Sequence, residues 1–274
     1  MSVVLITRQG GSILSSLADR VTTANDEMQQ LIQLSEVLAA YTQRAPLSSV
    51  TIAIAGTRVL REPFDVPGGV SARNVERFAA SRAEQLGRQL GVDVCHDFYL
   101  LTEDAARRQR GVLIVCRRNS LNAVVSAVSR VTSVALRVVP ESVALTSAAL
   151  RLEHDWLCWR RGRCYELITS SAVESLFLTA SDDSTEQEMR AIEALLSQAG
   201  AVGEERVIRL AGEPLRCSSQ YLSKAIGQRF VPMDMTRALG IATRCTALDD
   251  SFVVPFTLAN DAVSVPSLMM EAAQ

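Results

Sequence analysis

Residues 50–69, VTIAIAGTRVLREPFDVPGG, decide how the first half of the chain is built. Residues 50–55 form a continuous apolar and β-branched run, which predicts a buried strand. Residues 59–66 predict a second strand, which the following proline–glycine turn ends. Ser71 then suits the N-cap of a helix over residues 71–86, because its hydroxyl can accept an unsatisfied amide of the first turn.

Outward from this stretch, strand-like and helix-like segments alternate along most of the chain. The predicted strands cover 3–7, 94–101, 112–116, 134–139, 156–159, 164–169 and 205–210. The predicted helices cover 25–41, 117–130, 141–150, a segment after the capping box at 184–187, and 235–244. The strands at 156–159 and 164–169 flank a turn and predict a hairpin. Alternation of this kind is typical of α/β lobes with mixed sheets.

Composition excludes several classes of protein. The 274 residues are 48% hydrophobic, enough apolar surface to offset the ordering entropy of folding, so the chain is not disordered. A net charge of −2 gives no bulk attraction to nucleic acid or to anionic membranes. Residues 251–270 are apolar but contain two prolines and Asp261, which excludes a membrane-spanning helix there. The six scattered cysteines and the absence of a signal-peptide pattern predict a cytoplasmic protein.

Few side chains could perform acid–base or covalent chemistry. Lys224 is the single lysine, and it lacks the glycines of a phosphate-binding loop. The two histidines, His96 and His154, each precede an aspartate, but adjacent side chains of a strand leave opposite faces. In an extended segment His154 and Cys158 would lie roughly 13 Å apart, too far to share a metal. The residues therefore predict neither an enzyme nor a metal site.

Three weaker features stay open. Gly10-Gly11-Ser12 could present amides to a phosphate, although a tight turn followed by a serine N-cap is the simpler interpretation. Cys158 and Cys164 flank the predicted hairpin turn and could approach each other across it. The arginine clusters are mostly solvated faces; the alternative is a basic surface for an anionic partner, either acidic protein or lipid headgroups. Nucleic acid is less favoured, because no aromatic residues interleave the clusters to stack bases. The clustered residues are Arg107, Arg108, Arg110, Arg117, Arg118, Arg160, Arg161 and Arg163.

The order of segments from about residue 50 to residue 245 resembles the PilM/HofM family of type IV pilus assembly proteins. It also resembles a relative of that family, the cytoplasmic part of the type II secretion GspL proteins. Residues 51–67 are similar to the family's strand pair, which ends in an apolar residue followed by proline. The other segments are RAEQL at 82–86, DFY at 97–99, VLIVCRR at 112–118, LRVVPESVAL at 136–145 and RALGIATR at 237–244. All of these are packing patterns, so their order and spacing carry the resemblance.

The resemblance implies an actin-like (ribonuclease H-like) α/β fold of two lobes. The first lobe is expected at 1–140, with a small strand–helix–strand unit inserted at about 50–130, and the second lobe at 141–274. The implied role is that of a non-catalytic scaffold in the cytoplasm, peripheral to the inner membrane. Such a scaffold binds the cytoplasmic tail of an inner-membrane pilus or secretion protein and contacts the assembly ATPase, and a homo-oligomer stays open.

The family's peptide groove lies beside the inserted unit. Its expected walls in this sequence are Phe64, Val66, Phe78 and Leu86, and plain core packing is the alternative for each of them. An extended peptide in the groove would place alternate side chains in apolar pockets, while main-chain hydrogen bonds set its register.

The nucleotide loops of the family are degenerate in this sequence. Residues 7–11 stand where an acidic residue and a glycine are expected, and the hairpin at 156–169 lacks the second such pair. Gly212 keeps one glycine of the adenosine-side loop. We therefore expect no cofactor. A weak ATP-binding protein of the same fold is one alternative. Another is a GspL-like cytoplasmic domain that recruits the assembly ATPase and whose membrane span lies outside this chain.

Overall fold

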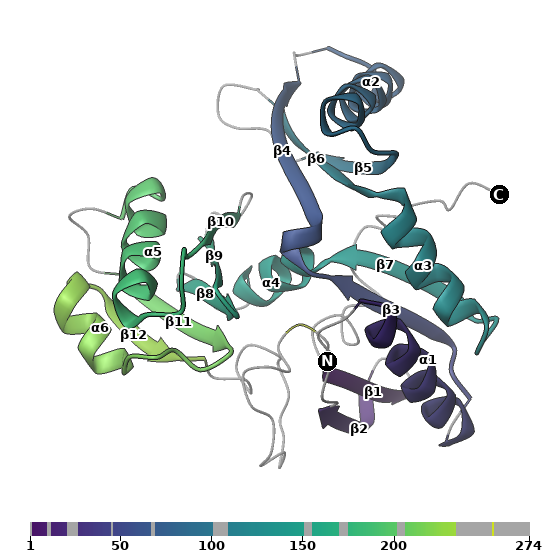
Figure 1. The fold of residues 1–274 in the computed structure, drawn as a ribbon, viewed down its shortest axis with the longest axis horizontal. Coiled ribbons are helices and arrows are strands. Elements are labelled where there is room, and N and C mark those ends of the chain that lie inside the picture. The colour runs from purple at the N-terminus through teal and green to yellow at the C-terminus, as the bar shows by residue number, and fades with distance from the viewer. Residues whose placement is uncertain are drawn as a thin grey trace. The chain divides into compact units, whose positions relative to one another are not determined.

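The computed structural model describes residues 2–9, 12–20, 27–44, 46–66, 69–100, 109–150, 155–169, 175–201, 206–233 and 254. The chain divides into two compact units (Figure 1). The five-stranded unit consists of Met1–Val21 and Glu141–Val263, and the two-sheet unit consists of Thr22–Pro140 and Ser264–Gln274. The predicted lobe boundaries stay a prediction. None of the helices in the described ranges is long and apolar enough to cross a membrane.

One sheet of the two-sheet unit is a parallel pair, β3 (Ser49–Ile54) with β7 (Ala135–Pro140). The helices α1 (Glu27–Arg44) and α3 (Arg118–Ser129) pack together, and Leu38, Val50 and Val128 form their shared core with β3. Both strands and both helices were expected from sequence, and each of their ends differs from the predicted one by one to three residues.

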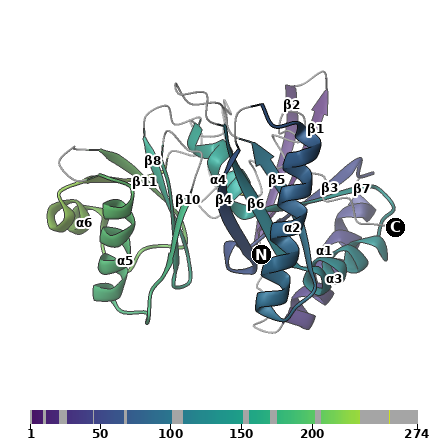
Figure 2. The same cartoon turned by 90° about the horizontal axis from the view of Figure 1, so that it is seen from above.

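The other sheet of this unit, the small sheet, is antiparallel and has the order β4-β6-β5. Its strands are β4 (Val59–Val66), β5 (Val94–Leu100) and β6 (Gln109–Arg117), and α2 (Ala72–Leu90) lies along one face (Figures 1 and 2). The short 3₁₀ helix Gly56–Arg58 leads from β3 into β4. The two strands predicted from residues 50–69 are confirmed, but they pair in different sheets.

Helix α2 differs from its prediction at both ends. At its start the Ser71 hydroxyl makes no capping bond, and the Ser71 carbonyl accepts the first amides instead. At its end the helix runs on through Gly87 to Gly91, whose φ of +64° is the left-handed conformation that closes helices. Gly87 serves packing, because a Cβ there would lie 3.1 Å from the Val94 side chain on β5.

The large sheet of the five-stranded unit has the order β10-β9-β8-β11-β12. Strands β8 (Trp156–Arg161), β9 (Cys164–Ile168) and β10 (Ser175–Thr179) are antiparallel, whereas β11 (Val207–Gly212) and β12 (Arg229–Pro232) run parallel to β8. The hairpin predicted around residues 160–163 is thus confirmed. Sequence reasoning missed β10, β12 and α6, which are short elements of four to eight residues.

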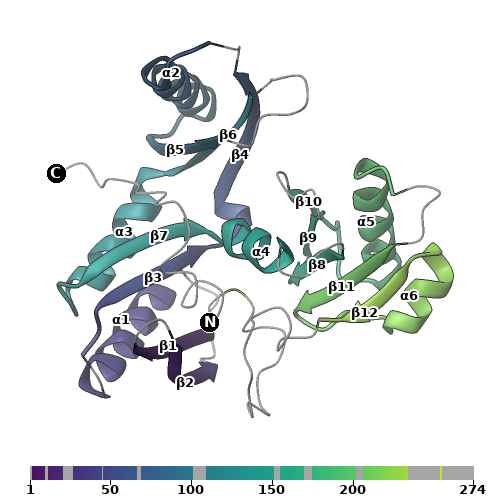
Figure 3. The ribbon, with the colours of Figure 1, turned by 180° about the vertical axis from the view of Figure 1, so that it is seen from behind.

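Helices cover this sheet on both faces. Figures 2 and 3 show α5 (Thr185–Gln198) and α6 (Ser219–Ile226) on one face, and α4 (Glu141–Leu150) packs against β8 and β9. One half of the predicted capping box is confirmed, since the Ser184 hydroxyl accepts the Gln187 amide. The Ser184 amide, which the other half of the box would use, donates to Asp182 at 2.9 Å. The main core lies under α5 and contains Trp156, Leu167, Ile192, Leu195 and Ile208.

At the N-terminus, β1 (Ser2–Gln9) and β2 (Ser12–Arg20) form an antiparallel hairpin. The interpretation of Ser12 as a helix N-cap is therefore wrong, because Ser12 begins a strand that pairs back onto β1. The helix predicted at 235–244 falls outside the described residues.

Candidate functional site

An aromatic cluster marks the small sheet. Phe64 on β4 lies between Phe78 on α2, at 5.4 Å between ring centroids, and Phe98 on β5, at 6.4 Å. Phe78 leaves 50% of its surface exposed although its neighbours are partly or fully buried. A half-exposed ring resting on other aromatic rings is an apolar anchor available to a partner.

Small residues place this cluster at the surface. Ala79 and Ala83 are fully buried and bring α2 close to Leu113 and Val115 on β6. Gly111, also on β6, leaves room for the Phe64 ring, because a Cβ at Gly111 would overlap that ring. The Phe64 ring therefore covers the backbone of the neighbouring strand and cannot sink further into the core.

The structure corrects half of the predicted peptide groove. Phe64 and Phe78 meet at the surface, whereas Val66 and Leu86 are buried side chains. Leu86 belongs to the small-sheet core with Ala79 and Ala83, as expected for the i, i+3, i+4 and i+7 positions that face a sheet. For Val66 and Leu86 the core interpretation holds, and neither side chain is available to line a groove.

The outer strand beside the cluster is β4, an edge of the small sheet. Pro63 stands in its middle, opposite Val112 of β6, and proline is confined to edge strands because it has no amide to donate. Next to the aromatic rings, the Arg82 guanidinium binds the Glu62 carboxylate at 2.7 Å and the Gln85 side chain at 2.7 Å. Apolar rings and a partly buried ion pair thus lie side by side between α2 and β4.

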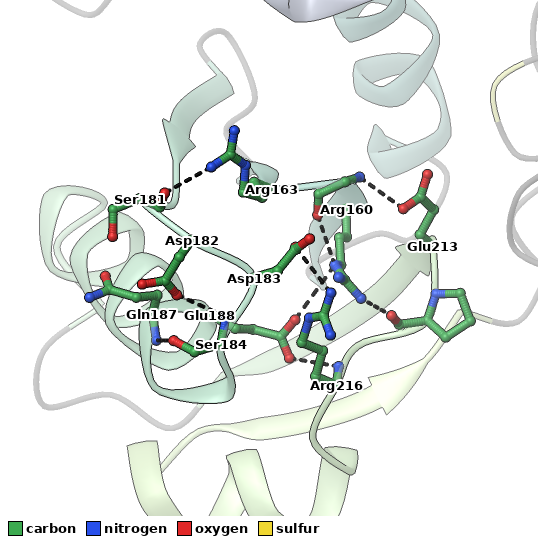
Figure 4. A network of polar contacts seen from close by, with 12 residues as sticks. Arg160, Arg163, Ser181, Asp182, Asp183, Ser184, Gln187, Glu188, Glu213 and Arg216 are labelled. Atoms are coloured by element: carbon green, nitrogen blue, oxygen red, sulfur yellow. Dashed lines mark hydrogen bonds and ion pairs between the residues drawn. The ribbon is translucent and has the colours of Figure 1, made fainter. Parts of the chain in front are cut away.

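The five-stranded unit contains a contrasting, closed polar network around Glu188 of α5 (Figure 4). The Glu188 side chain has no exposed surface, and its carboxylate accepts the Tyr165 hydroxyl at 2.9 Å. The same carboxylate accepts the amides of Arg216 at 2.8 Å and Cys217 at 3.3 Å. The Nε of Arg160 lies 3.5 Å from it and neutralises its charge.

The network also shifts the pKa of two neighbours. Burial, followed by the hydrogen bond to Glu188, raises the pKa of Tyr165 well above its ordinary value. The same two causes, in the same order, raise the pKa of Cys217 to about 11. Both groups therefore stay protonated at neutral pH and act as donors to a carboxylate rather than as nucleophiles.

Arg160 is a correction to the predicted anionic-partner patch. Its side chain is 7% exposed and binds the carbonyls of Gly162 and Pro214 as well as Glu188, so it cannot face a partner. Arg161 and Arg163 remain exposed, and they bind Glu141 at 3.2 Å and the Ser181 carbonyl at 2.8 Å. Arg107 and Arg108, and the side chain of Arg110, lie outside what the structure describes.

Gly212, the candidate for an adenosine-side loop, has a structural role in the network. Its φ of +95° is open only to glycine at low cost, and a Cβ there would overlap the Arg160 carbonyl oxygen. In the loop after β11, the Glu213 amide donates to the Arg160 carbonyl, and the amides of Arg216 and Cys217 donate to Glu188. These three amides form hydrogen bonds within the protein and are therefore not available to bind a phosphate.

The remaining candidates are dispersed. Gly10 and Gly11 and the His154 side chain lie outside the described residues, and Ser12 is in strand β2. Lys224 is exposed on α6, and His96 lies on β5 opposite Val115. Within the described ranges, no three histidine, cysteine or acidic side chains gather into a group that could hold a metal.

The cysteine pair suggested across the hairpin does not form. Cys158 is opposite Leu167, and Cys164 is opposite Arg161, so the two thiols are out of register. Two other cysteines do meet: Cys95 of β5 and Cys116 of β6 have their Sγ atoms 3.2 Å apart.

Sequence reasoning missed two features of the site: the buried Glu188 carboxylate and the Cys95–Cys116 pair. Glu188 falls on the apolar stripe of α5 with Ala191, Ile192 and Leu195, which is a signal that it is buried. The Cys95–Cys116 pair left no comparable signal, because strand register is not visible in the sequence.

Comparison with known proteins shows which solved structures share this fold. No protein-family model matches the sequence, and no curated protein matches it significantly. A chain of a PilM–PilN type IV pilus biogenesis complex has a TM-score of 0.72 at 14% identity, over 96% of this chain and 96% of that chain. The cytoplasmic domain of EpsL, an inner-membrane component of the type II secretion system of Vibrio cholerae, has a TM-score of 0.53 at 14% identity, over 94% of this chain and 87% of that chain. The resemblance predicted from sequence is therefore confirmed at the level of the fold: this chain has the actin-like α/β fold of PilM-type pilus assembly proteins and of the GspL-type cytoplasmic domains.

Proposed function

We propose that this chain is a non-catalytic assembly protein of a type IV pilus or of a related secretion or DNA-uptake machine. In this role it binds the cytoplasmic tail of an inner-membrane partner. The observation that carries the proposal is the extent of the fold similarity, which spans 96% of both chains in the comparison with a protein that forms a complex with PilN. A tail bound in this way would hold the chain at the inner membrane, and contact with the assembly ATPase is part of the same proposal.

The binding surface that we propose lies between α2 and the edge strand β4. Phe78 projects from α2 with half of its surface exposed, and Leu60 on β4 exposes 43%. Leu60 shares the parity of Phe64 along β4, so both lie on the face that α2 covers. Together these side chains form an apolar strip beside an edge strand, the arrangement that an extended peptide can recognise.

The partner's chemistry follows from this strip. An extended tail along β4 would place alternate apolar side chains against Phe78 and Leu60, and main-chain groups on either side of Pro63 would set its register. The Arg82–Glu62 ion pair next to the rings is partly exposed, with 31% and 29% of the two side chains accessible, and it favours a polar residue within the apolar tail.

The test is binding of fluorescent peptides to the full chain. The peptides are the cytoplasmic tails of single-span proteins encoded beside this chain, and anisotropy gives their dissociation constants. We expect one tail to bind and Phe78→Glu to weaken it at least 10-fold, because a charge replaces a central apolar anchor.

Leu90→Glu is the matched control. Leu90 lies on the same helix and is 60% exposed, but it stands in the last turn, away from Phe64. Its substitution should change the dissociation constant less than twofold. Equal weakening by both variants would place the binding site elsewhere, and failure of every tail to bind would contradict the proposal.

The non-catalytic part of the proposal is supported by the committed amides of the loop after β11. Thermal denaturation with and without ATP and Mg²⁺ tests it directly. A bound nucleotide at 100 times its dissociation constant would stabilise the fold by about 2.7 kcal/mol. We expect the midpoint to stay unchanged, and a clear upward shift would favour the alternative of a weak ATP-binding protein.

A further inference from the structure

Two cysteines of the small sheet face each other across neighbouring strands. Cys95 of β5 and Cys116 of β6 are direct partners in the antiparallel register, although 21 residues separate them in sequence. Their Sγ atoms are 3.2 Å apart, and the Cys95 thiol also lies 3.5 Å from the Cys116 carbonyl. Directly opposed residues have Cα atoms about 4.5–5.5 Å apart, which falls within the range that a disulfide spans.

The other described cysteines do not share this geometry. Cys158 is fully buried in the core of the five-stranded unit, Cys164 lies 3.5 Å from the Thr179 hydroxyl, and Cys217 binds Glu188. Among the five described cysteines, Cys95 and Cys116 are therefore the pair whose sulfur atoms are in contact.

The two thiols differ in their surroundings. Cys95 is partly exposed, whereas Cys116 is buried with Leu121 and Val138. A cation stands nearby, because the Arg118 guanidinium binds the Val94 carbonyl at 3.0 Å and the Asp93 carboxylate at 2.9 Å. A partly exposed thiol beside an arginine, with a second thiol behind it, is the arrangement of a reactive cysteine with its resolving partner.

We propose that Cys95 and Cys116 form an oxidation site, in which hydrogen peroxide converts the dithiol to a disulfide that clamps β5 to β6. Cys95 reacts first because it is partly exposed and a small oxidant can reach it. Cys116 then resolves the Cys95 sulfenic acid, because it lies directly opposite on the neighbouring strand. The inference does not depend on the proposed function.

The chemistry balances without another reactant. The Cys95 thiolate attacks one peroxide oxygen, the O–O bond breaks, and the departing hydroxide takes the proton that Cys95 released and becomes water. The Cys116 thiol then attacks the sulfur of the Cys95 sulfenic acid, the S–O bond breaks, and a second water leaves with the Cys116 proton. The two thiols lose two protons and two electrons, and one peroxide becomes two waters.

The assignment of roles agrees with the pKa directions. The hydrogen bond with Cys116, followed by the charge of Arg118, lowers the pKa of Cys95 against the opposing effects of burial and of the Asp93 charge. The hydrogen bond to Cys95, followed by burial, raises the pKa of Cys116. The thiolate is the reactive form of cysteine, so Cys95 is the thiol that attacks peroxide.

Oxidation would crosslink the small sheet near the end of β6 that leads into α3. Cys116 is the next-to-last residue of β6, whose end leads directly into α3. A crosslink there closes a loop of residues 95–116, and it leaves the aromatic cluster on the opposite face of the sheet free. We therefore expect oxidation to stabilise the two-sheet unit without abolishing binding at Phe78.

The experiment treats the full native chain with hydrogen peroxide, blocks the remaining thiols with N-ethylmaleimide and maps the peptides by mass spectrometry. The expected product is a peptide pair joined through Cys95 and Cys116, with a mass about 2 Da below that of the two thiols. The thermal midpoint should rise by several degrees and return on reduction.

Cys95→Ser removes the attacking thiol and should abolish both the crosslink and the thermal shift. Cys164→Ser is the matched control, since Cys164 is also a partly exposed strand cysteine, and it should retain both. Peroxide that leaves Cys95 as sulfinic acid with Cys116 free, or that joins a different pair in the wild-type chain, would overturn the proposal. The mapping of the wild-type chain decides this even if a variant fails to fold.

Discussion

The five-stranded unit buries charged side chains, whereas the small sheet exposes apolar ones. In the five-stranded unit, Glu188 and Arg160 are charged and buried, and every bond of the Glu188 carboxylate described above ends on the protein itself. In the small sheet, Phe64 and Phe78 are apolar and partly exposed. In the first region the hydrogen bonds and the charge of Glu188 are satisfied within the protein. The second region leaves apolar surface for another molecule to cover.

The two regions therefore differ in how a partner could affect them. A buried carboxylate that already accepts two amides and a hydroxyl holds the loop after β11 in one conformation. An exposed ring beside an edge strand has no such internal requirement and can gain contacts on binding. We therefore expect substitutions in the Glu188 network to change stability, and substitutions at Phe78 to change binding.

The largest effect should come from Arg160→Met. Loss of the guanidinium leaves the Glu188 carboxylate buried without a counter-charge, which typically costs about 3–5 kcal/mol. Urea denaturation should show this as a lower free energy of unfolding. Arg163→Met, three residues away and exposed, should cost less than about 0.5 kcal/mol. Similar costs for the two variants would show that the buried network around Glu188 contributes no more to stability than an exposed arginine does.

Gly212→Ala should follow, at a cost of about 3 kcal/mol. The alanine would need a positive φ and would also push its Cβ into the Arg160 carbonyl oxygen, which belongs to the backbone and cannot rotate away. Gly162→Ala has a positive φ of 57° with no atom near the new Cβ, so it should cost about 1 kcal/mol. The difference between the two midpoints of denaturation isolates the packing contribution.

Gly111→Ala tests the small sheet, with an expected cost of about 1–2 kcal/mol. Its methyl group would overlap the Phe64 ring, which Phe78 and Phe98 hold in place. A smaller side chain should relieve the overlap, so Gly111→Ala combined with Phe64→Leu should cost less than the sum of the single variants. Additive costs would show that the ring moves freely and that the cluster is not a fixed anchor.

The smallest effect concerns Asp97 of β5. Its Oδ1 accepts the Phe98 amide, whereas its Oδ2 is buried without a hydrogen-bond partner in the described part of the chain, and burial raises its pKa. Between the unfolded pKa near 4 and the higher folded value, the native state holds more protons, so its stability falls as pH rises through that window.

Asp97→Asn keeps the bond to Phe98 and removes the buried charge. We expect the variant to be more stable than wild type by about 0.5–1 kcal/mol at pH 7, and the gain should vanish below about pH 4. Denaturation midpoints measured across this range give the answer, and a gain that is independent of pH would mean that the charge is not its cause.

Much of the fold could be predicted because the deciding elements are locally patterned. The strand at 59–66, the helix beginning after Ser71 and the helix capped by Ser184 each satisfy their own propensity, cap or periodicity. Pairing was not predictable in the same way. The resemblance to the family suggested a strand pair at residues 51–67, whereas β3 pairs with β7 and β4 with β6 through contacts distant in sequence.

The candidate site was predictable only in part, for a related reason. An apolar residue on α2 can face the sheet, as Leu86 does, or stand at the side of the helix, as Phe78 does, and the difference is a fraction of a turn. Arg160 and Arg161 are neighbours in sequence but lie on opposite faces of β8, so a cluster of arginines in the sequence is not a patch in the protein.

Pro63 restricts the register in which another strand can add to β4, the edge strand of the small sheet. A strand that added along β4 would find donors at intervals and one position where none exists, so a continuous ladder with a second copy of β4 is interrupted. The partner's carbonyl opposite Pro63 must instead turn to water or to one of its own groups. A tail that is shifted by two residues would place a different carbonyl at this gap, and the proline thereby selects among alignments that the apolar side chains alone would tolerate.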